Sequence, residues 1–438
     1  MPNIETVTLA PDRPAPASDG AEGRPRILFV ETAPGVGGSV TNVLYPMVTG
    51  LDRSRYEPLV LFYRPNPYRE KIEAAGVRTL VFDRPRDTAH AAPITRLQSE
   101  HAAVFDALRA GGWRRSLYHA LGSYVRLGYV IPQILRLARV MRAARAQLVH
   151  LNRDHGWVGR EVVLAAKLAG LPVLCYAQNF TDFQHADRQI ARLVDYPVFC
   201  SDAIGRHCAA VGGIDPQRGR TIYPGVAEPD LWARPYDTAA VRRSFGWTDA
   251  DFVVGNIGRL IGWKGQDVFL RALAEVQRQA PGVKGLIVGG DDEARPGQPS
   301  YGDQLVSLAR ELGLSETVRF TGFRADIPPL TAALDVLVHS STDPEPFATT
   351  VIEALFAARP VIAMRAGGMP EMVTHGVTGL LAPPRDPPAM AQAILACYRD
   401  REYARRMGLA GQQAARERLT ARHHIGGFEA LYAGVFAG

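Results

Sequence analysis

Short apolar runs alternate along the chain with segments of helical spacing, and the alternation begins at Arg26. The first unit reads ILFVET, a glycine loop and VTNVLYPMVTGL, which is the order strand, loop, helix. Residues 158–169 have helical spacing, and four further apolar runs are predicted strands: EPLVLFY, RTLVF, QLVHLN and PVLCYA. Apolar strands that alternate with helices predict a parallel sheet covered on both faces.

A second series of the same kind begins near Phe252. Its predicted strands are FVVGNIG, VKGLIVGG, TVRFTG, DVLVHS and PVIAM, and its predicted helices cover 266–279, 302–313, 347–358 and 387–399. The chain is therefore predicted to be an α/β protein with two Rossmann-like, doubly wound parallel-sheet domains that face each other across a cleft. Ligands of such sheets bind beyond the carboxyl ends of the strands, so the loops there are where we expect chemistry.

Changes of composition along the chain predict five segments. Residues 1–24 are rich in Pro, Ala, Asp and Gly and have too little apolar content to offset the entropy of ordering, so we expect a disordered tail. The first domain is predicted over 25–223 and the second over 249–400. Between them, 224–248 contains several Pro and Asp residues and no strand pattern, which is typical of a linker. Residues 401–438 are predicted to be helical.

The composition is that of a globular protein. The 438 residues suffice for two or three domains, and 47% hydrophobic with 21% charged residues excludes collagen-like, coiled-coil and wholly disordered chains. The net charge is +6, and nearly all of the 50 basic residues are arginine, because lysine occurs only at positions 71, 167, 264 and 284. These arginines are spread along the chain with no recognition motif, so we do not expect nucleic-acid binding.

Cysteine usage and the N-terminal residues favour the cytoplasm. The four cysteines show neither the spacing of a disulfide scaffold nor a C-x-x-C metal pattern. The opening MPNIETVTLAPD has an acidic residue where a signal peptide carries positive charge, and no run approaches the ~18 to 20 apolar residues of a membrane span. We expect a cytoplasmic protein, at most peripheral on the inner face of the cell membrane.

The loop after the first strand of the second domain, GRLIGWKGQ, carries the first candidate chemistry. Gly258, Arg259, Lys264 and Gly265 lie within eight positions at a strand-to-helix junction. Two cations beside the free N–H groups of a helix start suit a diphosphate. Taken alone, the loop is equally consistent with a solvated turn.

Two carboxylates follow the strand DVLVHS. Glu345 precedes a predicted helix and Glu353 lies eight residues further on, roughly 10 Å along the helix axis. The N–H groups near Phe347, Ala348 and Thr349 have no intrahelical acceptor and are free for hydroxyls or anions. The alternative is that Glu345 only complements the helix dipole and that Glu353 is a solvated surface residue.

Two glycine pairs follow other strands. Gly367 and Gly368 come after PVIAM and let the backbone approach a ligand, or simply form a turn. Gly37 and Gly38 follow the first strand, but this loop lacks G-x-G-x-x-G and no acidic residue ends the second strand. NAD binding is therefore not expected.

Together these motifs resemble those of the retaining nucleotide-sugar glycosyltransferases of family four, the glycosyl transferases group 1, which have the type B two-Rossmann fold. The resemblance runs from Arg26 to about Arg418. It depends on the order of eight motifs: the early GG loop, YPGV, GRLIGWKG, GLIVGG, RFTGF, the pair Glu345 and Glu353, GGMPE, and HGVTGLL.

The resemblance implies transfer of a hexose, with retention of configuration, from a nucleotide-diphosphate sugar to an acceptor hydroxyl in cell-surface polysaccharide or glycolipid biosynthesis. It implies that Arg259 and Lys264 hold the diphosphate and stabilise the leaving group. Glu345, with Gly258 and the amides of Phe347, Ala348 and Thr349, would hold the donor sugar and phosphates, Glu353 the ribose hydroxyls, and Gly37 and Gly38 would lie against the donor phosphates or the acceptor. The C-terminal helices would cross back onto the first domain.

No cofactor or essential metal is expected, because no D-x-D stretch ends a strand and the two cations could neutralise the diphosphate. The sequence also departs from the family. Gln178, followed by Asn179, replaces a common His or Arg, and its amide cannot titrate. Ala348 replaces a glycine beside the donor sugar. His155, at a predicted strand end, is a further acceptor-side candidate.

Residues 107–153 contain no Asp or Glu but nine arginines interleaved with aromatic side chains. This pattern is typical of contact with an anionic membrane, which would suit a lipid-linked acceptor, and equally of a packed helix with solvated arginines. Other functions stay open: transfer to a small soluble acceptor such as a sugar or secondary metabolite, nucleotide-sugar epimerisation, or donor binding by an inactive homologue.

Overall fold

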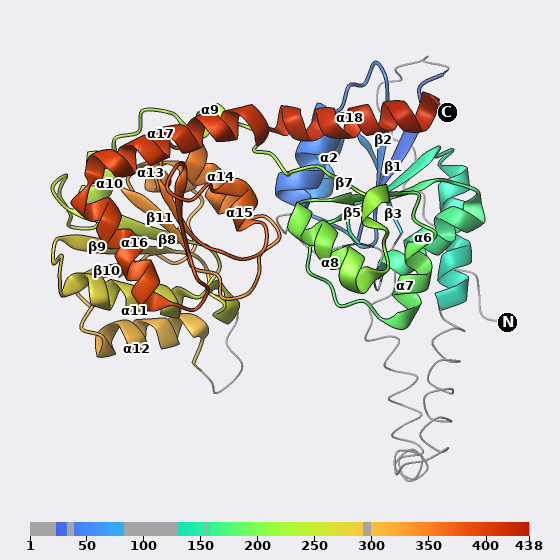
Figure 1. The fold of residues 1–438 in the computed structure, drawn as a ribbon. Helices are drawn as coiled ribbons and strands as arrows, with labels where there is room; N and C mark the ends of the chain where they lie inside the picture. The colour runs from blue at the N-terminus through green and yellow to red at the C-terminus, as the bar shows by residue number, and fades with distance from the viewer. Residues whose placement is uncertain are drawn as a thin grey trace, which may run out of the picture. The chain divides into compact units, whose positions relative to one another are not determined.

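The computed structural model describes residues 23–32, 39–82, 130–154, 156, 158–291 and 299–437. The chain divides into two compact units (Figure 1). The first comprises Met1–Ala177, Thr181–Val198 and Cys208–Gly219, and the second comprises Gln178–Phe180, Phe199–His207 and Arg220–Gly438.

The first sheet has seven strands in the order β3-β2-β1-β4-β5-β6-β7. They are β1 (Arg26–Glu31), β2 (Glu57–Phe62), β3 (Arg78–Val81), β4 (Leu148–Leu151), β5 (Val173–Ala177), β6 (Tyr196–Phe199) and β7 (Arg220–Thr221). The pairs β2–β3, β1–β2, β1–β4 and β4–β5 are parallel, which confirms the predicted sheet. The sequence analysis missed β6, because it is only four residues long and contains Pro197.

Helices connect these strands, and the twelve residues with helical spacing at 158–169 form one of them, as predicted. The helical elements are η1 (Ser39–Leu44), α1 (Tyr45–Gly50), α2 (Tyr68–Ala74), α6 (Val158–Ala169), α7 (His185–Ala191) and α8 (Asp202–Gly212), with a further helix over 130–143. The strand order places a topological switch between β1 and β4, where the chain leaves the sheet in opposite directions.

The second sheet has six strands in the order β10-β9-β8-β11-β12-β13, and all neighbouring pairs are parallel. They are β8 (Phe252–Ile257), β9 (Val283–Val288), β10 (Val318–Phe320), β11 (Val336–His339), β12 (Val361–Met364) and β13 (Gly379–Ala382). The switch of this sheet lies between β8 and β11. The five strands predicted from the second series are all present, and the sheet is the doubly wound arrangement that they indicated.

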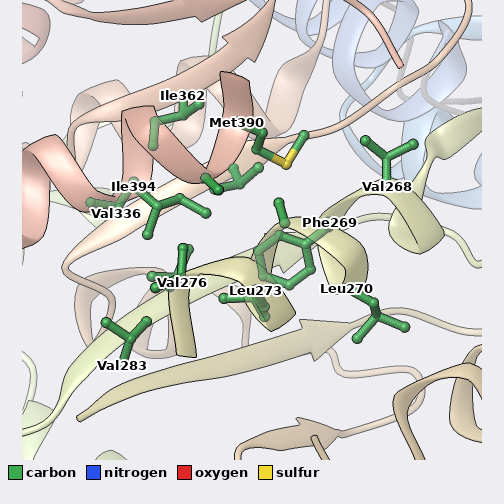
Figure 2. Packing of buried hydrophobic residues seen from close by; sticks show 14 of the residues in the cluster. Val268, Phe269, Leu270, Leu273, Val276, Val283, Val336, Ile362, Met390 and Ile394 are labelled. Atoms are coloured by element: carbon green, nitrogen blue, oxygen red, sulfur yellow. The ribbon is translucent and has the colours of Figure 1, made fainter. Parts of the chain in front are cut away.

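Helices cover both faces of the second sheet. The long helices of the second unit are α11 (Gln266–Gln277), α12 (Tyr301–Glu311), α14 (Thr349–Phe356), α16 (Pro387–Arg399), α17 (Arg401–Arg418) and α18 (Ala421–Ala437). Its shorter elements are α9 (Pro229–Trp232), α10 (Thr238–Ser244), η3 (Gly262–Lys264), α13 (Ile327–Ala332) and α15 (Met369–Met372), whereas η2 (Pro216–Arg218) belongs to the first unit. On one face, Phe269 and Leu273 of α11 pack with Met390 and Ile394 of α16 (Figure 2). On the other face, α14 packs with Trp232 and Trp247.

Two predicted segments belong to the second unit. Residues 224–248, predicted as a linker, contain α9 and α10 and bury two tryptophans in its core. The last helix, α18, starts beside this segment, where Val226 pairs with Thr420 and His424 Nδ1 donates to the carbonyl of Tyr223 at 2.8 Å. The crossing of the C-terminal helices onto the first domain stays a prediction.

Candidate active site

The candidate site lies at the topological switch of the second sheet. Strands β8 and β11 are neighbours, and their carboxyl ends, Ile257 and His339, lead into the loops 258–265 and 340–348. Parallel strands place these loops at one edge of the sheet, so Lys264 and Glu345 come together although 80 residues separate them in the chain.

Backbone contacts hold the two loops against each other. Gly265 has φ +67°, and a Cβ atom there would lie 2.1 Å from the carbonyl oxygen of Ser340, so only glycine fits. The amide of Thr342 donates to the carbonyl of Trp263 at 2.8 Å, and the Ser340 hydroxyl donates to the carbonyl of Lys264 at 2.8 Å. These bonds fix the backbone of Lys264 beside the loop that carries Glu345.

The carboxylate of Glu345 is buried and bonded at both oxygens. Oε1 accepts from the ammonium of Lys264, while Oε2 contacts Nε2 of His339 and accepts from the hydroxyl of Ser341 at 3.0 Å. Burial alone would raise the pKa of Glu345, but the His339 imidazole and the Lys264 ammonium outweigh it and hold that pKa well below its ordinary value. Glu345 is therefore a carboxylate at neutral pH.

The GGMPE loop supports Glu345 from behind. Gly367 has φ +60°, and a Cβ atom there would lie 2.2 Å from the carbonyl oxygen of Glu345. The amide of Gly368 donates to the same oxygen at 2.9 Å. The paired glycines thus let two backbones meet, and the close approach predicted for them is to the chain itself.

Helix α14 begins next to this carboxylate. Ala348 is its N-cap, is buried and offers no side-chain cap, and within the described residues no protein acceptor takes the amide hydrogens of Thr349 and Thr350. Phe347 lies just before the helix, stacked on Tyr223 with ring centroids 5.3 Å apart. The start of α14 therefore presents free N–H groups beside Glu345, as predicted.

Two further side chains predicted to bind the donor, those of Arg259 and Glu353, have no side-chain partner among the described residues. Arg259 is exposed and forms no ion pair with any described residue, and a Cβ atom at Gly258 would meet nothing within 4 Å. Glu353, on the second turn of α14, is half-buried and has no hydrogen-bond partner in the part of the chain that the structure describes. Burial raises the pKa of Glu353 to about 7. Both groups are available to a ligand.

A hollow of about 510 Å³ adjoins these loops. It is lined on one side by Gly262, Trp263, Thr342 and Asp343. Further lining residues come from the start of α11 and from the segment before α16: Asp267, Val268, Arg271, Arg385 and Pro387. The hollow thus touches the residues that flank Lys264.

Five predicted site residues come from the first sheet and its loops. Gly37, Gly38 and His155 lie outside the described residues. Gln178 and Asn179 directly follow β5, the former half-buried and the latter exposed.

Four polar residues at strand ends, which the sequence analysis did not single out, are further candidates for the site. His339 and Ser341 bind Glu345, and at the carboxyl ends of β1 and β4 the amide of Asn152 donates to Oε2 of Glu31 at 2.7 Å, both residues being buried. The sequence pattern that could have found them is a polar residue at or just after the end of an apolar strand, because ligands of a parallel sheet bind at the carboxyl ends of its strands.

The basic stretch 107–153 is described only from residue 130. Over 130–143 it is a helix whose side chains Leu137, Ala138 and Met141 are buried in the core of the first unit, while Ile131 and Leu135 are exposed. Packing therefore accounts for one face of this helix, and membrane contact stays a prediction. Among the described helices, none is long and apolar enough to cross a membrane.

Comparison with known proteins identifies what the second unit resembles. Residues 237–414 match the family model described as "Glycosyl transferases group 1". A D-inositol 3-phosphate glycosyltransferase from Nocardia farcinica is 34% identical over 233 residues, which are 51% of this chain and 49% of the relative. One from Mycobacterium tuberculosis is 32% identical over 48% of this chain and 42% of the relative. The chain thus spans about half the length of the curated relatives it matches.

Solved structures match nearly the whole chain. Anabaena Alr3699/HepE in complex with UDP and glucose has a TM-score of 0.73 at 25% identity, over 94% of this chain and 100% of that one. A glycosyltransferase from Rickettsia africae has a TM-score of 0.76 at 16% identity, over 94% and 99%. The two α/β domains therefore have the type B glycosyltransferase fold, which confirms the predicted fold class.

Proposed function

We propose, on the premise that this chain belongs to the group 1 glycosyl transferases, that it transfers a sugar from a nucleotide-diphosphate sugar to an acceptor hydroxyl. The observation that carries the proposal lies at the switch of the second sheet, where Lys264 pairs with Glu345 beside the free amides of α14, and where the exposed Arg259 lies on the same loop as Lys264. Cations and amide hydrogens suit phosphates, and a fixed carboxylate suits sugar hydroxyls.

The proposed donor diphosphate binds between the two cations. Lys264 exchanges part of its ion pair with Glu345 for a phosphate oxygen, and Arg259 binds from the exposed side of the loop. As the bond from the sugar to the diphosphate breaks, negative charge grows on the leaving oxygen. Charge-stabilising donors that are fixed in advance lower the free energy of such a transition state.

The two carboxylates then bind the two sugars of the donor. Glu345 accepts from a hydroxyl of the transferred sugar, and Glu353 accepts from the ribose hydroxyls, because its carboxylate has no described protein partner. The methyl group of Ala348, where the family commonly has glycine, narrows the space beside the sugar.

We also propose retention of configuration without an essential metal. Lys264 and Arg259 supply the positive charge that a divalent ion supplies elsewhere. Gln178 cannot act as a base, since an amide does not titrate, and the leaving diphosphate itself takes the proton of the acceptor hydroxyl.

The proposed acceptor is a sugar or a lipid-linked sugar of cell-surface polysaccharide or glycolipid, reached by a peripheral protein in the cytoplasm. A small acceptor is the second candidate, favoured by the relatives from Nocardia farcinica and Mycobacterium tuberculosis, which are D-inositol 3-phosphate glycosyltransferases.

The test incubates the protein with UDP-, GDP- and ADP-sugars and either inositol phosphate or a membrane extract. We expect nucleotide release that needs both donor and acceptor and that continues in EDTA, with the anomeric configuration of the donor kept in the product by NMR. Conversion of donor without acceptor would indicate an epimerase. Donor binding without release would indicate an inactive homologue.

Membrane contact has its own test. The protein is floated with vesicles of neutral lipid and with vesicles that contain anionic lipid, at low and at high salt. Binding that requires anionic lipid and weakens with salt supports the lipid-linked acceptor. Absence of binding at low salt favours the small acceptor.

A further inference from the structure

We propose that His339 is a positioning residue for Glu345: with Ser341 it anchors oxygen Oε2, so that Oε1 stays in place and exchanges the Lys264 ammonium for a hydroxyl of the donor sugar. This inference rests on the proposed function. His339 is not part of the motif formed by Glu345 and Glu353. It is the last residue of strand β11 and lies six residues before Glu345.

The geometry separates the two oxygens of one carboxylate. Among the described residues, Oε1 contacts the Lys264 ammonium alone, and this ammonium stands on a flexible four-carbon stem. Oε2 contacts the His339 imidazole and the Ser341 hydroxyl, and these two groups are also 3.3 Å from each other. His339 and Ser341 are 5% and 2% exposed, so neither can swing away without disturbing the core.

Among the described residues, the buried imidazole of His339 makes polar contacts through Nε2 alone. Its Nδ1 atom is buried with no hydrogen-bond partner in the described structure, so the only polar bonds of the ring are those of Nε2. Leaving a ring nitrogen unsatisfied in the core costs free energy, which an apolar side chain of similar size would avoid. The bond to Glu345 is what offsets this cost.

The neighbouring strand makes the anchor rigid. The amide of Asn256, on β8, donates to the carbonyl of Val338 at 3.0 Å and to the hydroxyl of Ser340 at 2.9 Å. These bonds hold the backbone of Val338 and the side chain of Ser340, the two residues that flank His339. The imidazole is therefore placed by the sheet itself, and the position of Oε2 is set before any ligand arrives.

Anchoring matters when the donor binds. Lys264 moves toward the diphosphate, and a carboxylate with no other partner would follow the ammonium or turn toward water. Because Oε2 stays on His339 and Ser341, Oε1 keeps its position and accepts the sugar hydroxyl. His339 thus influences recognition of the transferred sugar and has no contact of its own with the diphosphate.

The test compares His339→Leu, which removes the Nε2 bond, with His339→Gln, whose amide nitrogen can donate from nearly the same place. Calorimetry measures the Kd of the best sugar nucleotide in the panel and of its nucleoside diphosphate, and assays give kcat/KM. Loss of a hydrogen bond to a charged group predicts roughly 10- to 100-fold weaker donor kcat/KM in His339→Leu. We expect recovery to within about 5-fold in His339→Gln, with the Kd of the nucleoside diphosphate unchanged in both.

Three outcomes are decisive. Equal donor kcat/KM in His339→Leu and the wild type overturns the inference alone. Equal loss of affinity for the nucleoside diphosphate and for the sugar nucleotide, or a lowered Tm that His339→Gln does not restore, shows a merely structural residue and also overturns it. A wild type that binds no sugar nucleotide overturns the proposed function, and the inference with it.

Discussion

The two sheets place different chemistry at the same topological point. Each has its switch between the first and fourth strand of its series, so in both cases two loops meet at the carboxyl edge. In the second sheet this edge carries Lys264 and Glu345 as an ion pair, whereas in the first it carries Glu31 and Asn152 as a carboxylate bonded to an amide. The fold determines where a ligand binds, and the loop residues determine which ligand it is.

The carboxyl edges of the two sheets differ in charge, and this difference indicates which substrate each edge is expected to bind. A cation beside free helix amides favours phosphate, and a carboxylate with an amide favours hydroxyl groups. We therefore expect donor binding to depend on the second sheet and acceptor binding on the first. Three substitutions test this division, in order of expected effect.

The largest effect is expected for Lys264→Ala. Removal of the cation that stabilises the leaving diphosphate is expected to lower kcat by about 100-fold or more at saturating donor and acceptor. The matched control is Lys284→Ala, because Lys284 lies on β9 of the same sheet, 3.9 Å from Asp251, and outside the cluster. Unchanged kcat in Lys264→Ala would contradict the assignment of donor binding to the second sheet.

A smaller effect is expected for Glu31→Gln. The substitution keeps the shape and one acceptor oxygen but removes the charge, so the KM for the acceptor is expected to rise by roughly 10-fold. The KM for the donor should stay within a factor of two. A rise in the donor KM alone would reverse the assignment of the two edges, and thermal unfolding of the variant checks that the buried substitution is tolerated.

The smallest effect is a pH dependence carried by Glu353. Its pKa is raised to about 7 by burial, so the carboxylate charges as pH rises through that value. Ribose hydroxyls donate better to the charged form, and the Kd of the nucleoside diphosphate should fall by a few-fold between pH 6 and pH 8. For Glu353→Gln, calorimetry should show no change of the Kd with pH that arises from residue 353. A slope of equal size in the variant assigns the effect to another group, such as the second phosphate ionisation.

The same raised pKa affects stability in the opposite direction. Between the ordinary pKa of a glutamate and about 7, the folded protein holds a proton that the unfolded chain has released. The free energy of unfolding therefore falls as pH rises through this window, by roughly 2 to 3 kcal/mol at most for one half-buried group. Bound nucleotide, which partners the carboxylate, should reduce that loss.

Much of this could be predicted from the sequence. Apolar runs located the strands, and residue types in the loops made Lys264 and Glu345 candidate site residues. The ion pair between Lys264 and Glu345 forms because β8 and β11 are neighbours in the sheet. A local sequence pattern cannot predict which strands are neighbours. His339 was predicted only as the end of a buried strand, because a single polar residue after three apolar ones shows no periodic pattern. Gly367 was predicted to approach a ligand or to form a plain turn, and it lies against the backbone of Glu345.

The ion pair between Lys264 and Glu345 has a consequence for selectivity. A lysine already neutralised by a buried carboxylate attracts free anions weakly, so inorganic phosphate gains little by entering. A ligand that opens the pair must offer an anion to the ammonium and a hydroxyl to the carboxylate at once. A sugar nucleotide carries both groups, so we expect the pair to favour the intact proposed donor over free phosphate.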